Sequence, residues 1–395
     1  MMLPIHLRFL QNILVKYGYK LELLDTTHSQ IVNEGLQNVH NDTCYPALLV
    51  IGQLLDAVKS GKYDKSKLAL IITQTGGGCR ASNYIYLLRK ALKKNGMEYI
   101  PVISFNLSSM ERNPGFKMTP GLLVEFVYAV LYGDLLMLLS NQTRPYEIKH
   151  GDADELAEKW IVQLCKELSG RSILNNREFK RNLEQITSDF AAIPMEKTDK
   201  IKVGVVGEIY MKYSPLGNNN LEDFLQQEGA EVEVPGLMYF VIYCCDNNTT
   251  DNRLYGNKKL ASIFTSLLTN YLIKMQNMLI NAVKTQDCFR APASFKQIKS
   301  LVQAYIGTGT KMGEGWLLTA EMLELVHSGV ENIVCTQPFG CLPNHISGKG
   351  MIRKIKEHHP NANIVAIDYD PGATRINQEN RIKLMLSTAR LNSIY

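Results

Sequence analysis

The chain has 395 residues, of which 45% are hydrophobic and 21% charged, and its formal net charge is +5. This length exceeds what one hydrophobic core usually serves, so two domains are expected. The charges are mixed in sign and no long basic run is interleaved with aromatic residues, so nucleic acid is not an expected partner.

The amino-terminal segment does not have the pattern of a secretory signal, because His6 and Lys16 fall at amphipathic spacing among its apolar positions. We therefore expect a cytoplasmic protein. The longest apolar tract, residues 121–140, could span a bilayer by length alone, but Glu125 and Asp134 would then lie in hydrocarbon. A buried helix is favoured, and no membrane partner is expected.

The first periodic segments predict a β-α-β unit. Pro46 opens a helical pattern that ends at Gly61, and 67–73 is a continuous apolar run typical of a strand covered on both faces. A second helix is predicted from Tyr84 to Gly96 and a second strand over 99–105. The glycine triplet at 76–78 then lies in a strand-to-helix turn at the carboxyl edge of a parallel sheet, where open α/β folds bind ligands.

The rest of the chain predicts a mostly helical region and a second α/β pattern. Four further strands are expected, within residues 200–210, 230–236, 332–345 and 363–370, and a helix closes the chain. The predicted fold is α/β, with two Rossmann- or flavodoxin-like parallel-sheet domains and a helical insert. The predicted divisions are a first α/β domain over 1–118, the helical region over 119–198 and a second α/β domain over 199–395.

Eight cysteines in a chain expected to be cytoplasmic are more consistent with thiols, metal ligands or catalytic groups than with disulfides. Cys165, Cys244 and Cys245 lie in amphipathic or apolar patterns and are predicted to pack in the core. Four others fall beside turn residues at the ends of predicted elements, where two α/β domains could bring them to one cleft: Cys44, Cys79, Cys335 and Cys341.

An iron–sulfur cluster is one interpretation of this pattern. The amino terminus of a helix favours the thiolate form of a cysteine, the N–H groups of Gly76, Gly77 and Gly78 could point at inorganic sulfide, and Arg80 could offset negative charge. The simpler interpretation is an ordinary turn and small buried hydrophobic side chains. Because C-x2-C repeats and compact Cys/His pairs are absent, spacing alone favours the simpler interpretation over a cluster or a structural zinc.

Long motifs distributed from about residue 25 to 390 resemble the carboxyl-terminal region of the large 2-hydroxyacyl-CoA dehydratase activase-like proteins. That region is similar to the cluster-binding subunits of 2-hydroxyacyl-CoA dehydratases and to double-cubane cluster proteins. The motifs that carry the resemblance are NDTCYPALLVIGQLLDAVKSGKYD, ALIITQTGGGCRASNYIYLLRKAL, VGEIYMKYSPLGNNNLEDFL, QPFGCLPNHISGKG and IDYDPGATRINQENRIKLML.

The resemblance implies an oxygen-sensitive iron–sulfur protein with a cluster, of 4Fe-4S or double-cubane type, between two α/β domains. It implies cluster ligands at Cys44, Cys79 and Cys341, with Cys335 either a fourth ligand or a packing residue. It also implies a partner, an actin-like-fold ATPase activator domain or chain, that delivers a low-potential electron. A dimer is a candidate assembly.

Three functions remain open at this point. The first is a reductase-type component that transfers low-potential electrons. The second is a 2-hydroxyacyl-CoA dehydratase subunit that uses a ketyl-radical mechanism on an acyl-CoA, with Glu208 as an acid/base candidate, although helix capping is favoured for Glu208. The third is a non-catalytic assembly module.

Two features depart from the family pattern. The actin-like ATPase domains and the upstream cysteine-bearing segment of the large activases have no counterpart in this sequence, and it contains no P-loop. We therefore do not expect ATP hydrolysis by this chain alone. We expect Cys44, Cys79 and Cys341 to surround one inter-domain cleft, and Cys165 and Cys288 to lie elsewhere.

Overall fold

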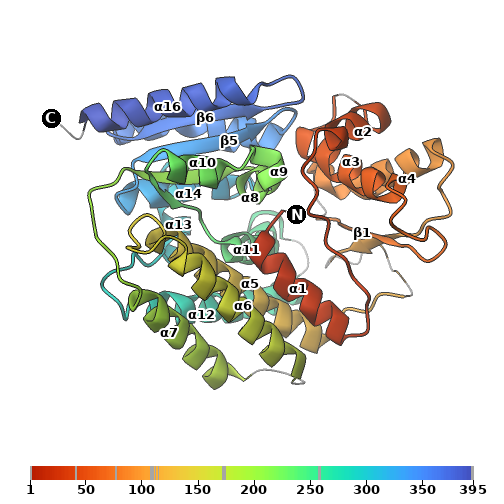
Figure 1. The fold of residues 1–395 in the computed structure, drawn as a ribbon, viewed down its shortest axis with the longest axis horizontal. Coiled ribbons are helices and arrows are strands. Elements are labelled where there is room, and N and C mark those ends of the chain that lie inside the picture. The colour runs from red at the N-terminus through yellow and green to blue at the C-terminus, as the bar shows by residue number, and fades with distance from the viewer. Residues whose placement is uncertain are drawn as a thin grey trace.

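The computed structural model has a mixed α/β fold, with two parallel sheets and a large helical part (Figure 1). It describes the whole chain except residues 1, 41, 76–77, 107–110, 112, 114, 171–174, 257–258 and 393–395.

The amino-terminal unit is the β-α-β arrangement that the sequence predicts. Strands β1 and β2 pair in parallel, with Leu70 opposite Val102, and α4 connects them. Helix α3 begins one residue before the predicted proline, and Cys44 occupies its N-cap position without a capping hydrogen bond from the side chain. The elements of this unit are α2 (Gln30–Asn38), α3 (Tyr45–Lys59), β1 (Leu70–Thr73), α4 (Tyr84–Lys94) and β2 (Val102–Phe105).

The predicted helical region is confirmed as three helices, and the amino-terminal helix α1 packs against two of them, α5 and α6. Within the described part of the chain, α5 is the one helix long and apolar enough to cross a membrane, and 67% of its most apolar 18-residue window is buried inside the protein. The helices of this layer are α1 (Pro4–Lys16), α5 (Pro120–Thr143), α6 (Asp152–Gly170) and α7 (Asn176–Ala191).

The two acidic residues of α5 are buried with partners. Lys16 Nζ of α1 donates to Glu125 Oε1 at 2.6 Å. Asp134 lies 2.8 Å from His6 Nε2 and accepts hydrogen bonds from the backbone N–H groups of residues 237 and 238, which begin α11 (Leu237–Tyr255). Asp134 therefore caps a helix other than its own, with a carboxylate at the positive end of the helix dipole.

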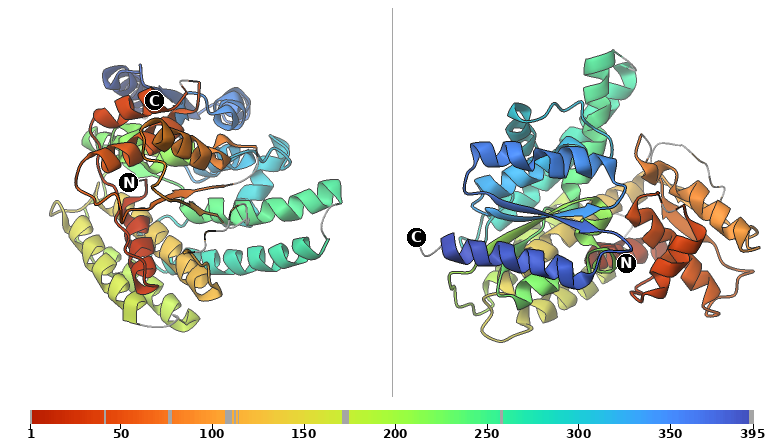
Figure 2. Two further views of the ribbon diagram at one scale, coloured as in Figure 1. Left: turned by 90° about the vertical axis from the view of Figure 1, so that its right-hand side faces the viewer. Right: turned by 90° about the horizontal axis from the view of Figure 1, so that it is seen from above.

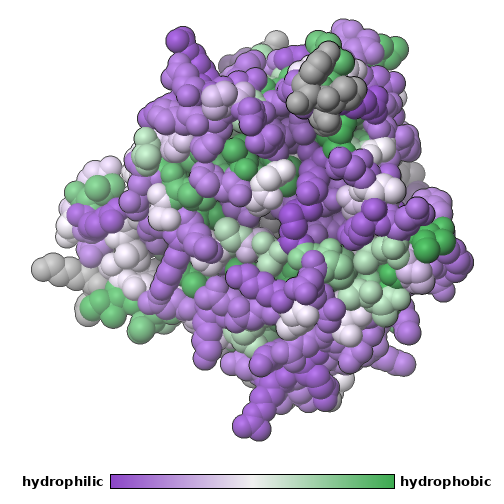
Figure 3. Space-filling model, turned by 90° about the vertical axis from the view of Figure 1, so that its left-hand side faces the viewer, coloured by the Kyte–Doolittle hydropathy of each residue, from purple (hydrophilic) through white to green (hydrophobic). Residues whose placement is uncertain are grey.

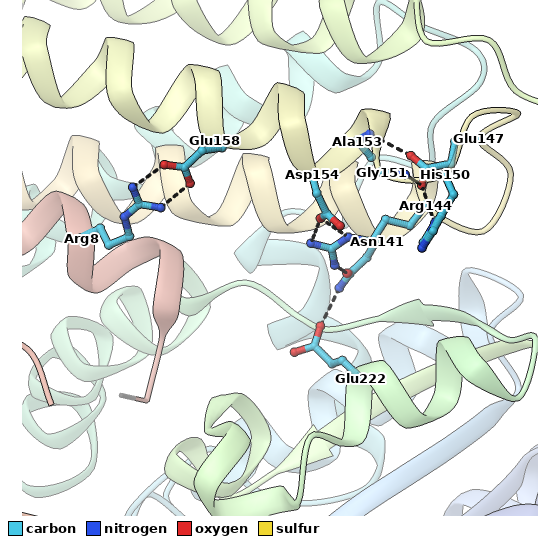
Figure 4. A network of polar contacts seen from close by, with 10 residues as sticks. All are labelled: Arg8, Asn141, Arg144, Glu147, His150, Gly151, Ala153, Asp154, Glu158 and Glu222. Carbon is cyan, nitrogen blue, oxygen red and sulfur yellow. Dashed lines mark hydrogen bonds and ion pairs between the residues drawn. The ribbon is translucent and has the colours of Figure 1, made fainter. Parts of the chain in front are cut away.

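Polar contacts also join α5 to its neighbours. Arg144, just beyond the end of α5, binds Asp154 of α6, and Asn141 donates to Glu222 of α10 (Leu221–Gln227) at 2.8 Å (Figure 4). The first contact lies within the helical layer, and the second links this layer to α10, beside the second sheet.

The second sheet has four parallel strands in the order β4-β3-β5-β6, and all four were predicted. Side chains of successive residues alternate between two apolar clusters, because neighbouring residues of a strand point to opposite faces. Val334 belongs to the cluster that includes the amino-terminal unit, whereas Ile333 and Cys335 belong to the cluster that includes the helical layer. The strands are β3 (Lys202–Gly207), β4 (Glu231–Glu233), β5 (Asn332–Pro338) and β6 (Asn363–Tyr369).

The long connection from β4 to β5 is where the sequence prediction is least complete. It contains a hairpin of two long helices that stands out from the body of the molecule (Figure 2). Its base packs on α5 and α7, so it extends the helical layer. Cys244 of α11 is exposed, so its predicted place in the core is wrong. The helices here are α11, α12 (Lys259–Val283), α13 (Phe295–Leu301) and α14 (Trp316–His327).

The remaining helices follow strands of the second sheet. Two short helices after β3 precede α10, and a long helix after β6 was predicted to close the chain. The proposed boundaries near residues 118 and 198 fall between elements, and the division into three domains stays a prediction. These helices are α8 (Ile209–Tyr213), α9 (Pro215–Asn218), α15 (Ile352–His358) and α16 (Arg375–Asn392).

We expect Asp134→Ala to lower the free energy of unfolding by about 3 kcal/mol, because the change leaves His6 and the first N–H groups of α11 without their buried acceptor. Urea unfolding monitored by circular dichroism measures the effect. The matched control is Glu158→Ala, which breaks an exposed pair with Arg8 and should cost less than about 1 kcal/mol. Equal losses in the two variants would contradict this role for Asp134.

Candidate functional site

The carboxyl edge of the second sheet has a switch in strand order between β3 and β5. The strand that follows β3 in the chain lies on one side of this pair, and the strand that follows β5 lies on the other. Crevices at such switch points are where open parallel sheets bind ligands. Glu208 directly follows β3, and Cys341 follows β5 by three residues.

Cys44 is brought to this edge by backbone contacts. The N–H of Tyr45 donates to the carbonyl oxygen of Phe339 at 2.9 Å. A Cβ on Gly340 would lie 3.0 Å from Cys44 Cα, and the φ of Gly340 is +73°, so this close passage requires glycine. The segments that carry Cys44 and Cys341 are therefore in direct contact, although they come from the two ends of the chain.

Cys79 approaches the same place from the turn after β1. A Cβ on Gly313 would lie 3.9 Å from Cys79 Sγ and 3.1 Å from Pro343 Cγ, and a Cβ on Gly78 would lie 2.5 Å from Met312 Sδ. The loop before α14 thus lies between the turn of Cys79 and the segment just after Cys341. Sequence reasoning missed this loop, although IGTGTKMGEG has four closely spaced glycines directly before a helix.

The three thiols influence one another electrostatically. Burial raises the pKa of Cys44, and raises that of Cys79 to about 12. The negative charge of a Cys44 thiolate further raises the pKa of Cys79, and a Cys79 thiolate raises that of the buried Cys341. Cys44 Sγ also lies 3.0 Å from Tyr84 Oη, which favours the thiolate and lowers the pKa of Cys44. Without a cation, the cluster is expected to hold neutral thiols.

Two carboxyl groups complete the site. Glu208 accepts a hydrogen bond from the N–H of Met211 at 2.9 Å, which confirms its predicted capping role. Glu314 accepts from the N–H of Ile209 at 2.8 Å, so both carboxyls bind the first turn of α8. Burial and the nearby Glu314 raise the pKa of Glu208 to about 8, and Lys212 opposes the shift. Glu314 is the residue of this pair that sequence reasoning missed.

Both carboxyls act on the thiols. Ionised Glu208 raises the pKa of all three cysteines, and Glu314 raises that of Cys79 and Cys341. The candidate site is therefore a cluster of three thiols and two carboxyls, which we call the thiol–carboxyl cluster: Cys44, Cys79, Cys341, Glu208 and Glu314.

The other residues predicted to surround the cluster are the three glycines and Arg80. Gly76 and Gly77 lie outside the described residues, whereas Gly78 packs against Met312. Arg80 is exposed directly after Cys79, and its positive charge lowers the pKa of Cys44, in the direction predicted for it.

Cys335 is not grouped with the other three thiols. Its side chain is fully buried in β5, burial raises its pKa to about 12, and the charged groups that act on it are Lys349, Asp368 and Glu321. Cys165 lies on α6 near Arg8, and Cys288 lies in the loop before α13, so both are elsewhere, as expected.

The arrangement does not suit a single metal ion. Among the described residues, no three His, Cys, Asp or Glu side chains form a group that could hold one. Ligands of one ion with bonds of about 2.3 Å lie about 4 Å apart, whereas thiolates around a four-iron cluster lie roughly 6 to 7 Å apart. Three thiols from separate segments, of which Cys44 and Cys341 are buried and Cys79 is partly buried, with one exposed arginine beside them, fit the larger group in donor chemistry.

A separate cavity of about 270 Å³ lies away from these thiols. It is bounded by the start of α1, by α5 and by the segment from Tyr213 to Asp223, and its wall includes Ser140. This segment overlaps MKYSPLGNNN, which the sequence offers as a weak pyrophosphate-binding candidate. The volume is at the small end for ligand pockets, so the cavity does not enclose a coenzyme A.

No family model, curated protein or solved structure matches this chain. The function is therefore argued from the chemistry of the thiol–carboxyl cluster.

The raised pKa of Glu208 has a measurable consequence for stability. Its ordinary pKa of 4.5 applies to the unfolded chain, so between about pH 4.5 and pH 8 the unfolded state releases a proton that the folded state keeps. The free energy of unfolding should thus fall as pH rises through this window, and Glu208→Gln should reduce the slope. Urea unfolding of the reduced, iron-free protein at several pH values measures it.

The control for this measurement is Glu158→Gln. The Arg8 guanidinium holds the pKa of Glu158 below its usual value, so its titration lies below the window and the slope should match that of the wild type. A slope unchanged by Glu208→Gln would show that Glu208 is already ionised in the folded protein at neutral pH.

Proposed function

We propose that this chain is an iron–sulfur protein that transfers low-potential electrons, with Cys44, Cys79 and Cys341 as protein ligands of the cluster. The observation that carries the proposal is that three cysteine-bearing segments, distant in the chain, meet at the carboxyl edge of the second sheet. An iron–sulfur cluster supplies one-electron transfer when it is bound. The proposal includes a Rossmann- or flavodoxin-like topology for each sheet unit.

The residues around the thiols have defined roles in this proposal. Tyr84 is a hydrogen-bond donor to the sulfur of Cys44, and hydrogen bonds to sulfur stabilise its negative charge. Arg80 contributes positive charge. When Glu208 and Glu314 are ionised, their negative charge lowers the affinity of the site for an electron. When they are protonated, this effect is lost. The protein thus sets the electron affinity of the site through its own charges.

The rim of the site suits a protein partner. Four large apolar side chains are exposed beside the cluster segments: Met312, Phe339, Leu342 and Ile346. An electron donor must approach the cluster closely, and exposed apolar side chains in one area are typical of such contacts. As the partner we propose an actin-like-fold ATPase that reduces the cluster, as the family resemblance implies.

A second candidate function is a dehydratase subunit acting on a 2-hydroxyacyl-CoA. The observation that favours it is the carboxyl pair, because a carboxyl with a pKa near neutrality can donate or accept a proton at the operating pH. A dehydration assay with the reduced activator and a panel of 2-hydroxyacyl-CoA thioesters separates the two. Turnover that Glu208→Gln abolishes would establish the lyase, and inactivity with every substrate would leave electron transfer.

We expect anaerobic reconstitution with ferrous iron and sulfide to give a broad absorbance near ~400 nm, together with bound iron and acid-labile sulfide. Alanine at Cys44, Cys79 or Cys341 should lower the iron content substantially, because each change removes one ligand. Iron analysis and absorbance on the same samples provide the measurement.

Cys165→Ala and Cys288→Ala are matched controls, since both thiols lie outside the cluster, and they should retain wild-type iron. Cys335→Ala should also retain iron while lowering stability, because the change leaves a small cavity in the core. The proposal would be contradicted if the protein held no iron after reconstitution, or if all three ligand variants kept their iron.

A further inference from the structure

The distal half of the α11–α12 hairpin has its polar and apolar side chains in reversed positions. Three small polar residues are buried there: Thr250, Ser262 and Thr269. The hydroxyl of Thr269 bonds to a carbonyl of its own helix, which satisfies it without solvent. Large apolar side chains face outward instead. A surface helix normally buries its apolar face, so this reversal indicates a face that another surface covers.

The outward apolar side chains lie on both helices of the hairpin. On α12 it follows one stripe at helical spacing, and on α11 it occupies the last turn. The exposed fractions of its side chains range from 37% to 69%. Hydrophobic surface is visible on this part of the molecule at the left of Figure 3, beside the grey atoms, whereas most of the view is hydrophilic. We call this surface the hairpin face: Leu254, Tyr255, Ile263, Phe264, Leu267 and Leu268.

We propose that the hairpin face is a self-association surface, on which the hairpin of a second copy of this chain packs to form a four-helix bundle. Large apolar side chains offer about 150 to 250 Å² each, so these six leave about 700 Å² uncovered. A stable interface buries about 800 Å² per partner, and the area of this face is close to that value. The exposed area also exceeds the largest apolar patch of most monomers, about 300 to 600 Å².

Charge favours a second copy over a different protein. A two-fold axis brings each central side chain against its own counterpart, so like charges there would repel. The hairpin face has no charged residue; α12 contains no acidic residue, and its two lysines, Lys259 and Lys274, lie beyond the two ends of the apolar stripe in the sequence. The two acids of α11 are already paired, Asp246 with Lys299 and Asp251 with Lys311. Two antiparallel helices with one open apolar side are half of a four-helix bundle.

The test is the mass of the full chain in solution. Light scattering and sedimentation velocity, over about 1 to 100 µM, should give twice the chain mass of 44.6 kDa at the upper end. Leu267→Glu should raise the dissociation constant at least about 100-fold, because two carboxylates would be buried close together. Phe264→Ser should weaken the dimer by loss of apolar contact. Circular dichroism should show both variants folded, since both sites are exposed.

The matched control is Leu384→Glu, on α16, where the native side chain is 70% exposed compared with 66% for Leu267. It should leave the dimer intact. A wild-type chain that sediments as a single copy at every concentration overturns the proposal, as does a dimer that Leu267→Glu does not weaken. A single-copy chain that binds vesicles of anionic phospholipid through this face would identify a membrane surface as the occupant instead.

Discussion

The hydrogen bond from the N–H of Tyr45 to the carbonyl oxygen of Phe339 joins the amino-terminal unit to the edge of the second sheet. It forms where Gly340 passes within contact of Cys44, so no side chain separates the two backbones. The amino terminus of α3 is thereby fixed at the switch point between β3 and β5. The positions of Cys44 and Cys341 relative to each other, and so the whole thiol–carboxyl cluster, depend on this contact.

A second close passage sets the carboxyl side of the site. Gly207 ends β3 with φ +138°, and a Cβ there would lie 2.2 Å from Thr336 Oγ1, so the chain turns tightly against β5. This turn places Glu208 as the cap of α8, and Glu314 reaches the same first turn from the loop before α14. The two carboxyls bind the same short helix, so they lie close together and repel each other when both are ionised. Burial and this repulsion raise the pKa of Glu208.

Local sequence pattern was enough to predict all six strands, the helices α3, α4 and α16 beside them and the capping role of Glu208, because buried parallel strands and their turns have distinctive periodicity. The hairpin of α11 and α12 was not predicted as such, since its packing partners are α5 and α7, far away in the chain. The same reason explains Cys244: an apolar run indicates a buried segment, but which side of the helix faces outward depends on tertiary contacts. Glu314 was missed because its role depends on Ile209, 105 residues earlier.

The thiols and carboxyls of the cluster constrain one another through charge. Three thiolates and two carboxylates would put five negative charges at one sheet edge, against which Arg80 and Lys212 act with positive charge, and Lys212 is already paired with Glu321. Burial makes that excess costly, so an iron-free site must stay largely protonated. A cation that binds the sulfurs reverses this preference for the protonated form, because a coordinated thiol loses its proton. If the proposed cluster binds here, its binding is therefore coupled to proton release, and Glu208, with its pKa near neutrality, is the group best placed to adjust its charge as the charge on the sulfurs changes.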